Sequence, residues 1–279
     1  AYLFDGLNVS KDKETMLHQN QYPVIFMTLK DMKNRNAELQ KQQFLSLIQT
    51  VLEKNIELLH SEKVNFITKK RLESLVNNQV TDIDLQNALY YICVALKQHY
   101  QKNVILLIDE YDVPLQSAYT NGYYDEMVSL IRNILGNALK TNSSLYFAVL
   151  TGCLRISKES IFTGLNNLKV MSITNVQFDE YFGFTDSEVK EMLNYYGLMD
   201  HFDSMKAWYD GYRFGNQDVY CPWDVLSHCD NLRADPNARP EDYWSNTSGN
   251  AIVRRFIDLA NGKTKEEIER LIAGETILK

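Results

Sequence analysis

The chain has 279 residues, of which 45% are hydrophobic and 11% aromatic, so it can bury a substantial core and is not a disordered sequence. Its length suits one large domain or two modest ones. The formal net charge of −7 does not support wholesale nucleic-acid binding, which usually needs a basic face, although it leaves room for a local basic groove.

The four cysteines indicate a reducing compartment. Cys93, Cys153, Cys221 and Cys229 are scattered, and none belongs to a C-x-x-C pair. His228 lies near the last two, but the paired spacing of a zinc site is absent, so we interpret Cys221 and Cys229 as buried apolar cysteines. The sequence shows no signal peptide and no apolar run long enough to span a bilayer. We therefore expect a cytoplasmic protein with no membrane partner.

The first part of the chain alternates short apolar runs with helical patterns. Apolar runs rich in β-formers predict strands at 22–29, 103–108, 144–150 and 170–173. Apolar residues at helical spacing predict helices at 36–60, 82–100 and 123–140, the second of them capped by Thr81. The alternation predicts an α/β fold with a mostly parallel sheet and helices on both faces.

Beyond about residue 179 the pattern changes. Short helical stretches appear at 186–196 and 201–209, followed by turn signals at 210–211 and 214–215. We expect an α/β core over residues 1–178 and a mainly helical, lid-like subdomain over residues 179–279.

Two acids follow the apolar strand at 103–108. The carboxyl ends of strands in a parallel sheet are where ligands bind, so Asp109 and Glu110 would lie at the functional edge. The first carboxylate can hold Mg²⁺, and the second can orient or deprotonate an attacking water. A strand that simply ends and turns polar would give the same pattern. Asp112 adds a third acid just beyond the strand, which favours the functional interpretation.

The next predicted strand also ends in polar residues. Thr151 stands at its tip, where ATPases of this architecture place a residue that senses the γ-phosphate. Arg155 follows shortly after, and a guanidinium there would stabilise the negative charge of the transferred phosphoryl group. The alternative for Arg155 is a structural ion pair.

A phosphate-binding loop of the form G-x-x-x-x-G-K-[ST] is not found. Gly262, Lys263 and Thr264 provide the last three positions, but Ile257 stands where the first glycine belongs, and the preceding residues suggest a helix instead of a strand. We expect a helix end at 261–262 and a new helix capped by Thr264.

Eight segments together resemble the AAA-ATPase-like family of bacterial and archaeal proteins, which often carry a C-terminal restriction-endonuclease-like nuclease domain. The segments are LFDGL (3–7), YPVIFMTLKD (22–31), VILLIDEYDVPL (104–115), LTGCLRISKESIFTGLNNL (150–168), FGFTDSEV (182–189), WYDGYRFG (208–215), VYCPWDVL (219–226) and YWSNTSGN (243–250).

The resemblance implies a P-loop NTPase fold that uses ATP and Mg²⁺, with Asp109 and Glu110 as the Walker B pair. It also implies a phosphate loop upstream of the LFDGL segment and a nuclease domain after residue 279, so we expect this chain to be a fragment. The strand before the phosphate loop normally lies between the Walker B and sensor strands. Without it, those two strands either close up or stay apart around a gap.

Our leading hypothesis is an ATPase module in a larger protein. Glu110 and Arg155 would be catalytic, Asp109 would hold the metal, and Asp112 and Thr151 would contribute to the nucleotide site. The first rival is a non-catalytic scaffold built on a degenerate ATPase fold. The second is a nuclease that uses the acids directly, but such a site needs a nearby lysine, and the first one downstream is Lys140.

The other predicted partner is an attached effector, and assembly into an oligomer is compatible with the family.

The glycines of the GYRFG segment are interpreted as a turn that presents Tyr212 and Arg213. Nearby aromatic residues are interpreted as subdomain core, not as a platform for stacking bases: Trp208, Tyr209, Trp223 and Trp244.

Overall fold

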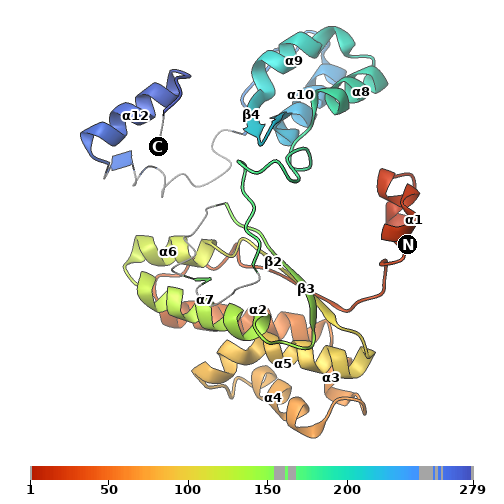
Figure 1. Cartoon of the computed structure of the whole chain (residues 1–279), viewed down its shortest axis with the longest axis vertical. Helices are drawn as coiled ribbons and strands as arrows, with labels where there is room; N and C mark the ends of the chain where they lie inside the picture. Colours follow the sequence, from red (N-terminus) through yellow and green to blue (C-terminus); the bar gives the residue numbers. More distant parts are fainter. Residues whose placement is uncertain are drawn as a thin grey trace. The chain divides into compact units, whose positions relative to one another are not determined.

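The structure is a computed structural model that describes residues 2–153, 161–162, 168–244, 254, 257–258 and 260–277. The chain divides into two compact units, Ala1–Leu168 and Lys169–Lys279, and each is described by itself. Figure 1 colours them along the sequence, from red to green and from green to blue. The division between functional domains predicted after residue 178 stays a prediction.

Unit 1 contains a parallel sheet of three strands, which confirms the predicted α/β class. The strands are β1 (Val24–Thr28), β2 (Val104–Asp109) and β3 (Leu145–Leu150), in the order β1-β2-β3. All three coincide with predicted strands. We expected β2 and β3 either to close up or to stay apart around a gap. They pair directly with each other.

The helices of unit 1 follow the strands in an alternating order. They are α1 (Lys13–Met16), α2 (Ala37–Glu53), α3 (Glu57–His60), α4 (Phe66–Val76), α5 (Asp82–Tyr100), α6 (Val113–Asn121) and α7 (Tyr124–Leu139), and two short 3-10 helices, η1 (Tyr2–Phe4) and η2 (Asn8–Lys11), precede α1. The predicted capping of α5 is confirmed, because the Asp84 backbone N–H donates to the Thr81 hydroxyl and the Asp84 carboxylate accepts from the Thr81 backbone N–H.

One expectation about these helices was wrong, and one helix was not predicted. The single helix predicted at 36–60 is interrupted after Glu53, where the Asn55 side chain donates to the Val51 carbonyl and Leu58 becomes fully buried. Helix α4 was not predicted. Asn65 caps it, and Leu72 and Leu75 bury its inner face.

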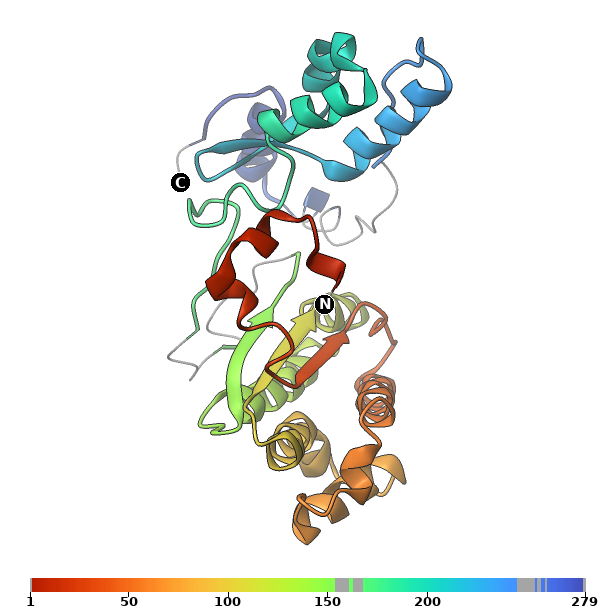
Figure 2. The same cartoon turned by 90° about the vertical axis from the view of Figure 1, so that its right-hand side faces the viewer.

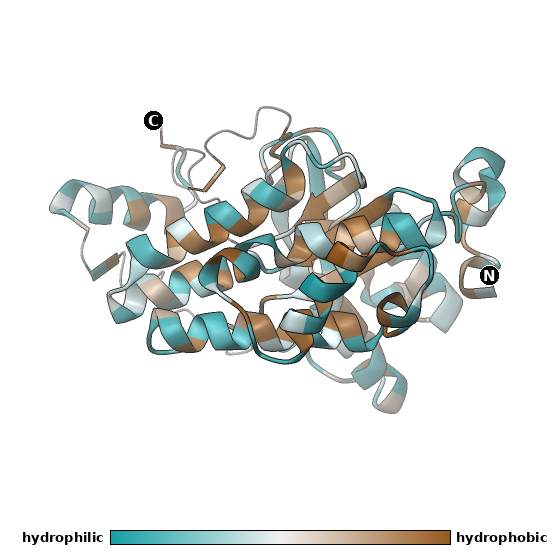
Figure 3. Cartoon of the chain, turned by 90° about the horizontal axis from the view of Figure 1, so that it is seen from below, coloured by the Kyte–Doolittle hydropathy of each residue, from teal (hydrophilic) through white to brown (hydrophobic). Residues whose placement is uncertain are grey.

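The helices that pack on the sheet lie on one face. Helix α2 packs on β1, α5 on β2 and α7 on β3, and Figures 1 and 2 show these helices on the same side of the strands. In Figure 3 apolar and polar residues alternate along the helices, as expected when one side of each helix faces the core.

The opposite face of the sheet is apolar and open. The alternate strand residues Val24, Phe26, Phe147 and Val149 are between 40% and 58% exposed, whereas their neighbours Ile25 and Leu106 are buried. The prediction of helices on both faces is therefore wrong for the described residues. It failed because β2 is apolar throughout, a pattern that suggests cover on both sides whether or not the described chain supplies it.

Unit 2 combines helices with a two-stranded antiparallel sheet. Its elements are α8 (Asp186–Tyr196), η3 (Met199–His201), α9 (Phe202–Tyr209), β4 (Asp210–Phe214), β5 (Gln217–Tyr220), α10 (Pro222–Ala234) and α12 (Gly262–Ile272). The turn signals at 210–211 were misread, since those residues begin β4, whereas the hairpin turns at 215–216.

Three further expectations about unit 2 need correction. Residues 170–173 form no strand; the Ile173 carbonyl instead accepts from the Gly215 N–H at 2.7 Å. Residues 211–214 of the GYRFG segment belong to strand β4 and only Gly215 lies in the turn, and Arg213 in the strand pairs with Asp218 at 2.7 Å. The tryptophans at 208, 223 and 244 are 46% to 57% exposed, so of the four aromatic residues assigned to the core only Tyr209 is buried.

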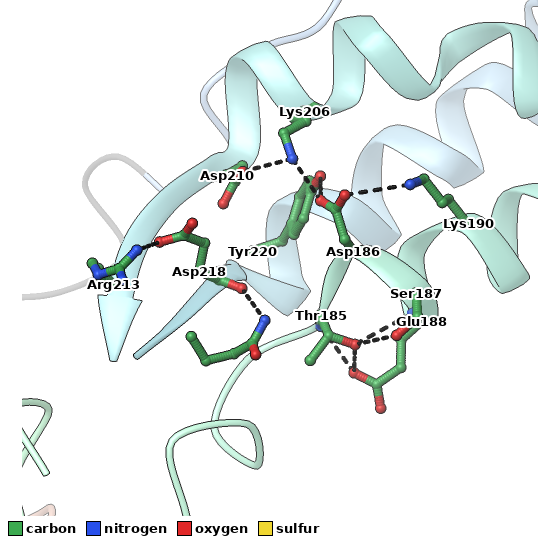
Figure 4. Close-up of polar contacts among 11 residues, drawn as sticks. Thr185, Asp186, Ser187, Glu188, Lys190, Lys206, Asp210, Arg213, Asp218 and Tyr220 are labelled. Carbon is green, nitrogen blue, oxygen red and sulfur yellow. Dashed lines mark hydrogen bonds and ion pairs between the residues drawn. The ribbon is translucent and has the colours of Figure 1, made fainter. Parts of the chain in front are cut away.

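A network around Asp186 joins three elements of unit 2 (Figure 4). The buried Tyr220 of β5 donates its hydroxyl to Asp186 at 2.6 Å, and Lys206 of α9 pairs with the same carboxylate at 2.9 Å. Lys190 lies one turn along α8, 3.4 Å away. The Tyr220 and Lys206 hydrogen bonds lower the pKa of the Asp186 carboxyl.

The Gly262-Lys263-Thr264 sequence occupies the first turn of α12. The helix is capped by Asn261, whose side chain accepts from the Thr264 N–H at 2.9 Å, so the cap lies three residues before the Thr264 cap predicted from sequence. The described residues 254 and 257–258, which precede it, are helical and not extended. None of the described helices is both long and apolar enough to cross a membrane.

Candidate functional site

Asp109 lies at the carboxyl end of β2, between two threonines. The parallel register places Thr28 of β1 opposite it, and the Thr28 hydroxyl donates to Asp109 Oδ2 at 3.3 Å. Thr151, immediately after β3, donates its hydroxyl to Asp109 Oδ1 at 2.6 Å. Polar groups from three neighbouring strand ends therefore meet at one carboxylate. The structure thus brings together Asp109 and Thr151, both expected from sequence.

Thr28 was missed by the sequence analysis. The signal was present, because Thr28 is the polar residue that ends the apolar strand β1, as Asp109 ends β2, and Thr151 follows β3 directly. Predicting its role required the strand register, which pairs Thr28 with Asp109.

The Asp109 carboxylate is held by neutral donors. In the part of the chain that the structure describes, it takes part in none of the ion pairs. Hydroxyl groups orient a carboxylate without neutralising its charge. No cation of the described residues therefore neutralises Asp109.

Glu110 has an unusual backbone conformation. Its φ is +54°, in the left-handed region that costs a side-chain-bearing residue roughly 1–2 kcal/mol. Hydrogen bonds on either side hold this turn: the Tyr111 N–H donates to the Thr151 carbonyl at 3.0 Å, and the Val113 N–H to the Glu110 carbonyl at 3.1 Å. Strained conformations of this kind concentrate at functional sites.

Asp112 is completely buried at the start of α6. Its Oδ1 accepts from the Cys153 backbone N–H at 3.3 Å, and its Oδ2 accepts from the Gln116 side chain at 2.7 Å. The carboxylate therefore connects the turn after β2 with the segment after β3.

Cys153 lies within the electrostatic field of the three acids. Burial, together with the charges of Asp112, Glu110 and Asp109, raises the pKa of its thiol. The structure thus brings all three acids to the same edge of the sheet as Thr151. Arg155, the remaining predicted catalytic residue, lies outside the described residues.

The donors at this edge fit Mg²⁺. That hard cation prefers oxygen ligands and is usually held by one or two carboxylates together with water and substrate phosphates. One carboxylate flanked by two hydroxyls meets that description. No group of three His, Cys, Asp or Glu side chains that could hold a metal ion occurs in the described ranges, the surroundings of Cys221 and His228 included.

Comparisons with known proteins identify the family of this chain. The chain is 33% identical over 128 residues to a protein from Azotobacter chroococcum mcd 1 described as "Uncharacterized protein in vnfD 5'region", a match that covers 45% of this chain and 24% of that protein. The chain therefore spans about a quarter of the length of this curated relative. No solved structure matches. Residues 1–162 match the family described as "Predicted AAA-ATPase", and this chain belongs to that family.

Proposed function

We propose that this chain carries the metal-binding and water-activating half of an ATPase site. The observation that carries the proposal is the meeting of Asp109, Thr28 and Thr151 at the carboxyl edge of the sheet. In parallel sheets that edge is where ligands bind. Membership of the predicted AAA-ATPase family supports nucleotide as the ligand.

Each residue has a distinct role in the proposal. Asp109 and Thr151 would hold Mg²⁺, with Thr151 also facing the γ-phosphate, and Thr28 would orient the Asp109 carboxylate. Glu110 would accept a proton from the attacking water, and Arg155 would stabilise the transferred phosphoryl group. Bound Mg²⁺ neutralises charge on the phosphates.

The phosphates also need a cradle of backbone N–H groups. We propose that a strand and helix from outside these 279 residues supply it. The open apolar face of the sheet supports this, because Val24, Phe26, Phe147 and Val149 leave a surface of the kind that a helix covers in doubly wound folds. A nuclease or other effector attached to the ATPase remains part of the proposal for the whole protein.

The same open face favours a second candidate, a scaffold without catalysis. Contiguous exposed apolar surface often marks an interface with another protein. In that case Asp109 and its threonines would only stabilise the ends of the strands.

The test compares the wild-type protein with Glu110→Gln and Asp109→Asn in the natural gene product that contains this chain. Loss of a general base typically costs about 10²–10⁴-fold in rate, so Glu110→Gln should abolish most hydrolysis of Mg·ATP while leaving its binding intact. Asp109→Asn should weaken binding of Mg²⁺. Unchanged hydrolysis in Glu110→Gln would remove Glu110 from the base role, and wild-type protein that binds neither Mg²⁺ nor ATP would favour the scaffold.

A further inference from the structure

The segment 151–153 leaves the sheet immediately after β3 and is attached to the turn that follows β2. The last paired residues of the two strands are Ile108 and Leu150. Beyond them the Thr151 N–H donates to the Ile108 carbonyl at 2.9 Å, and the Tyr111 N–H donates to the Thr151 carbonyl at 3.0 Å. These two bonds join the Thr151 backbone to β2 and to the turn after it, and the chain beyond Thr151 is held by a side chain.

That side chain is Asp112. Its Oδ1 accepts from the Cys153 N–H, two residues beyond Thr151, and its Oδ2 is held by Gln116 one turn along α6. Because the carboxylate is fully buried and both oxygens accept from the chain, Asp112 acts on the segment and not on solvent. A buried hydrogen bond of this kind positions a backbone because leaving its groups unpaired is costly.

Gly152 permits the close approach that this contact needs. A Cβ at this position would lie 2.5 Å from Asp112 Oδ1 and 2.9 Å from Tyr111 Cε1, both too short for any real contact. The segment can therefore lie against Asp112 only because residue 152 has no side chain. Asp112 and Gly152 together hold Thr151 where its hydroxyl reaches Asp109 at 2.6 Å.

We propose that Asp112 is a positioning residue, which fixes Thr151 against Asp109 through the Cys153 backbone and so sets the geometry of the cation site without touching the cation. This differs from the direct cofactor contact expected from sequence. The role in cation binding rests on the proposed function. The attachment of segment 151–153 to Asp112 does not depend on it.

The experiment separates positioning from ligation by comparing Asp112→Asn with Asp112→Ala in the full chain. An asparagine keeps an oxygen for the Cys153 N–H, and Gln116 can turn its amide to match the new side chain. Positioning therefore predicts that Asp112→Asn binds Mg²⁺ within about threefold of wild type, whereas Asp112→Ala loses roughly 10–100-fold, as for other outer-shell partners. Titration calorimetry with Mg²⁺ measures both. Equal losses in the two variants would make Asp112 a ligand and overturn the proposal.

Gly152→Ala provides a second variant that leaves Asp112 itself intact. It should weaken Mg²⁺ binding as Asp112→Ala does, because the added methyl group forces the segment away from the carboxylate. Gly136→Ala is the matched control, since a Cβ there meets nothing within 4 Å, and it should bind Mg²⁺ like wild type. Wild-type affinity in both Gly152→Ala and Asp112→Ala would overturn the proposal.

Amide hydrogen exchange tests the attachment independently of any metal. The Cys153 amide should exchange faster in Asp112→Ala and Gly152→Ala than in wild type, while amides of the core strand β2 keep their protection. Unchanged exchange at Cys153 would refute the attachment. If exchange rises as expected but wild type and Asp109→Asn bind Mg²⁺ equally poorly, the proposed function fails and the attachment stands.

Discussion

The two units each hold one aspartate at the centre of a polar network, and the two networks differ in charge. Asp186 in unit 2 is met by the buried Tyr220 hydroxyl and by the cations of Lys206 and Lys190. Asp109 in unit 1 is met by two neutral hydroxyls, from Thr28 and Thr151. A carboxylate whose chain supplies cations contributes to the fold. In the proposed function, a carboxylate that is oriented but not neutralised by the described chain receives a cation from outside.

The largest expected effect separates the two aspartates directly. Asp109→Asn should lower Mg²⁺ affinity by more than the roughly 10–100-fold that loss of an outer-shell partner costs, without reducing the free energy of unfolding. Asp186→Asn should reduce the free energy of unfolding and leave Mg²⁺ affinity unchanged. Calorimetric Mg²⁺ titration and urea unfolding of both variants measure this. If Asp109→Asn destabilised the fold as Asp186→Asn does, the contrast between a functional and a structural carboxylate would fail.

The hydroxyl donors around Asp109 should differ in importance. Thr151→Val is expected to weaken Mg²⁺ binding by about 10–100-fold, and Thr28→Val by less, because the Thr151 hydrogen bond is 2.6 Å long and the Thr28 hydrogen bond 3.3 Å. Thr151→Ser keeps the hydroxyl and serves as the control. A larger loss in Thr28→Val than in Thr151→Val would reverse the assigned order.

Tyr220→Phe should destabilise unit 2 without affecting Mg²⁺ binding. The variant removes a buried hydroxyl that donates to a charged carboxylate, which costs about 1–2 kcal/mol of unfolding free energy. Urea unfolding followed by circular dichroism measures the change. Tyr195→Phe, which removes a hydroxyl from a side chain that is 81% exposed, is the matched control and should change stability by less than about 0.5 kcal/mol. Equal effects of the two variants would show that the Asp186 network contributes little.

The smallest expected effect concerns acid stability. The pKa of Asp186 lies below its ordinary value of 3.8 in the folded chain, so ionised Asp186 favours folding. That stabilisation is present above pH 3.8 and is lost as the pH falls through the folded pKa. The side chain is 39% exposed and therefore screened, so the contribution should be below about 1 kcal/mol. Comparing unfolding at pH 5 and pH 3, wild type should lose more stability than Asp186→Asn.

Local patterns were sufficient to predict the three strands of unit 1 and the start of α5. Strands β1, β2 and β3 follow from apolar runs bounded by polar residues, and Thr81 marks the start of α5 because its hydroxyl satisfies a free backbone N–H. Helix α4 was missed, and α2 was merged with α3. Where such breaks occur depends on which apolar side chain, here Leu58, finds a place in the core.

The errors in unit 2 have a different cause. The Asp210-Gly211 pair resembles a turn, but the pairing of Asp210 with Tyr220 in the hairpin of β4 and β5 outweighs that local preference. The exposed tryptophans show the converse, since a large apolar side chain suggests the core although much of a protein's surface is apolar.

The sequence by itself determined that two acids end an apolar strand and that a threonine ends the next, because strand ends are marked by a local change from apolar to polar residues. Only the tertiary structure decided which residues meet. The parallel register placed Thr28 opposite Asp109, and the segment after β3 came to lie against Asp112 at Gly152. These contacts join residues far apart in the chain, so they depend on how all three strands pack together.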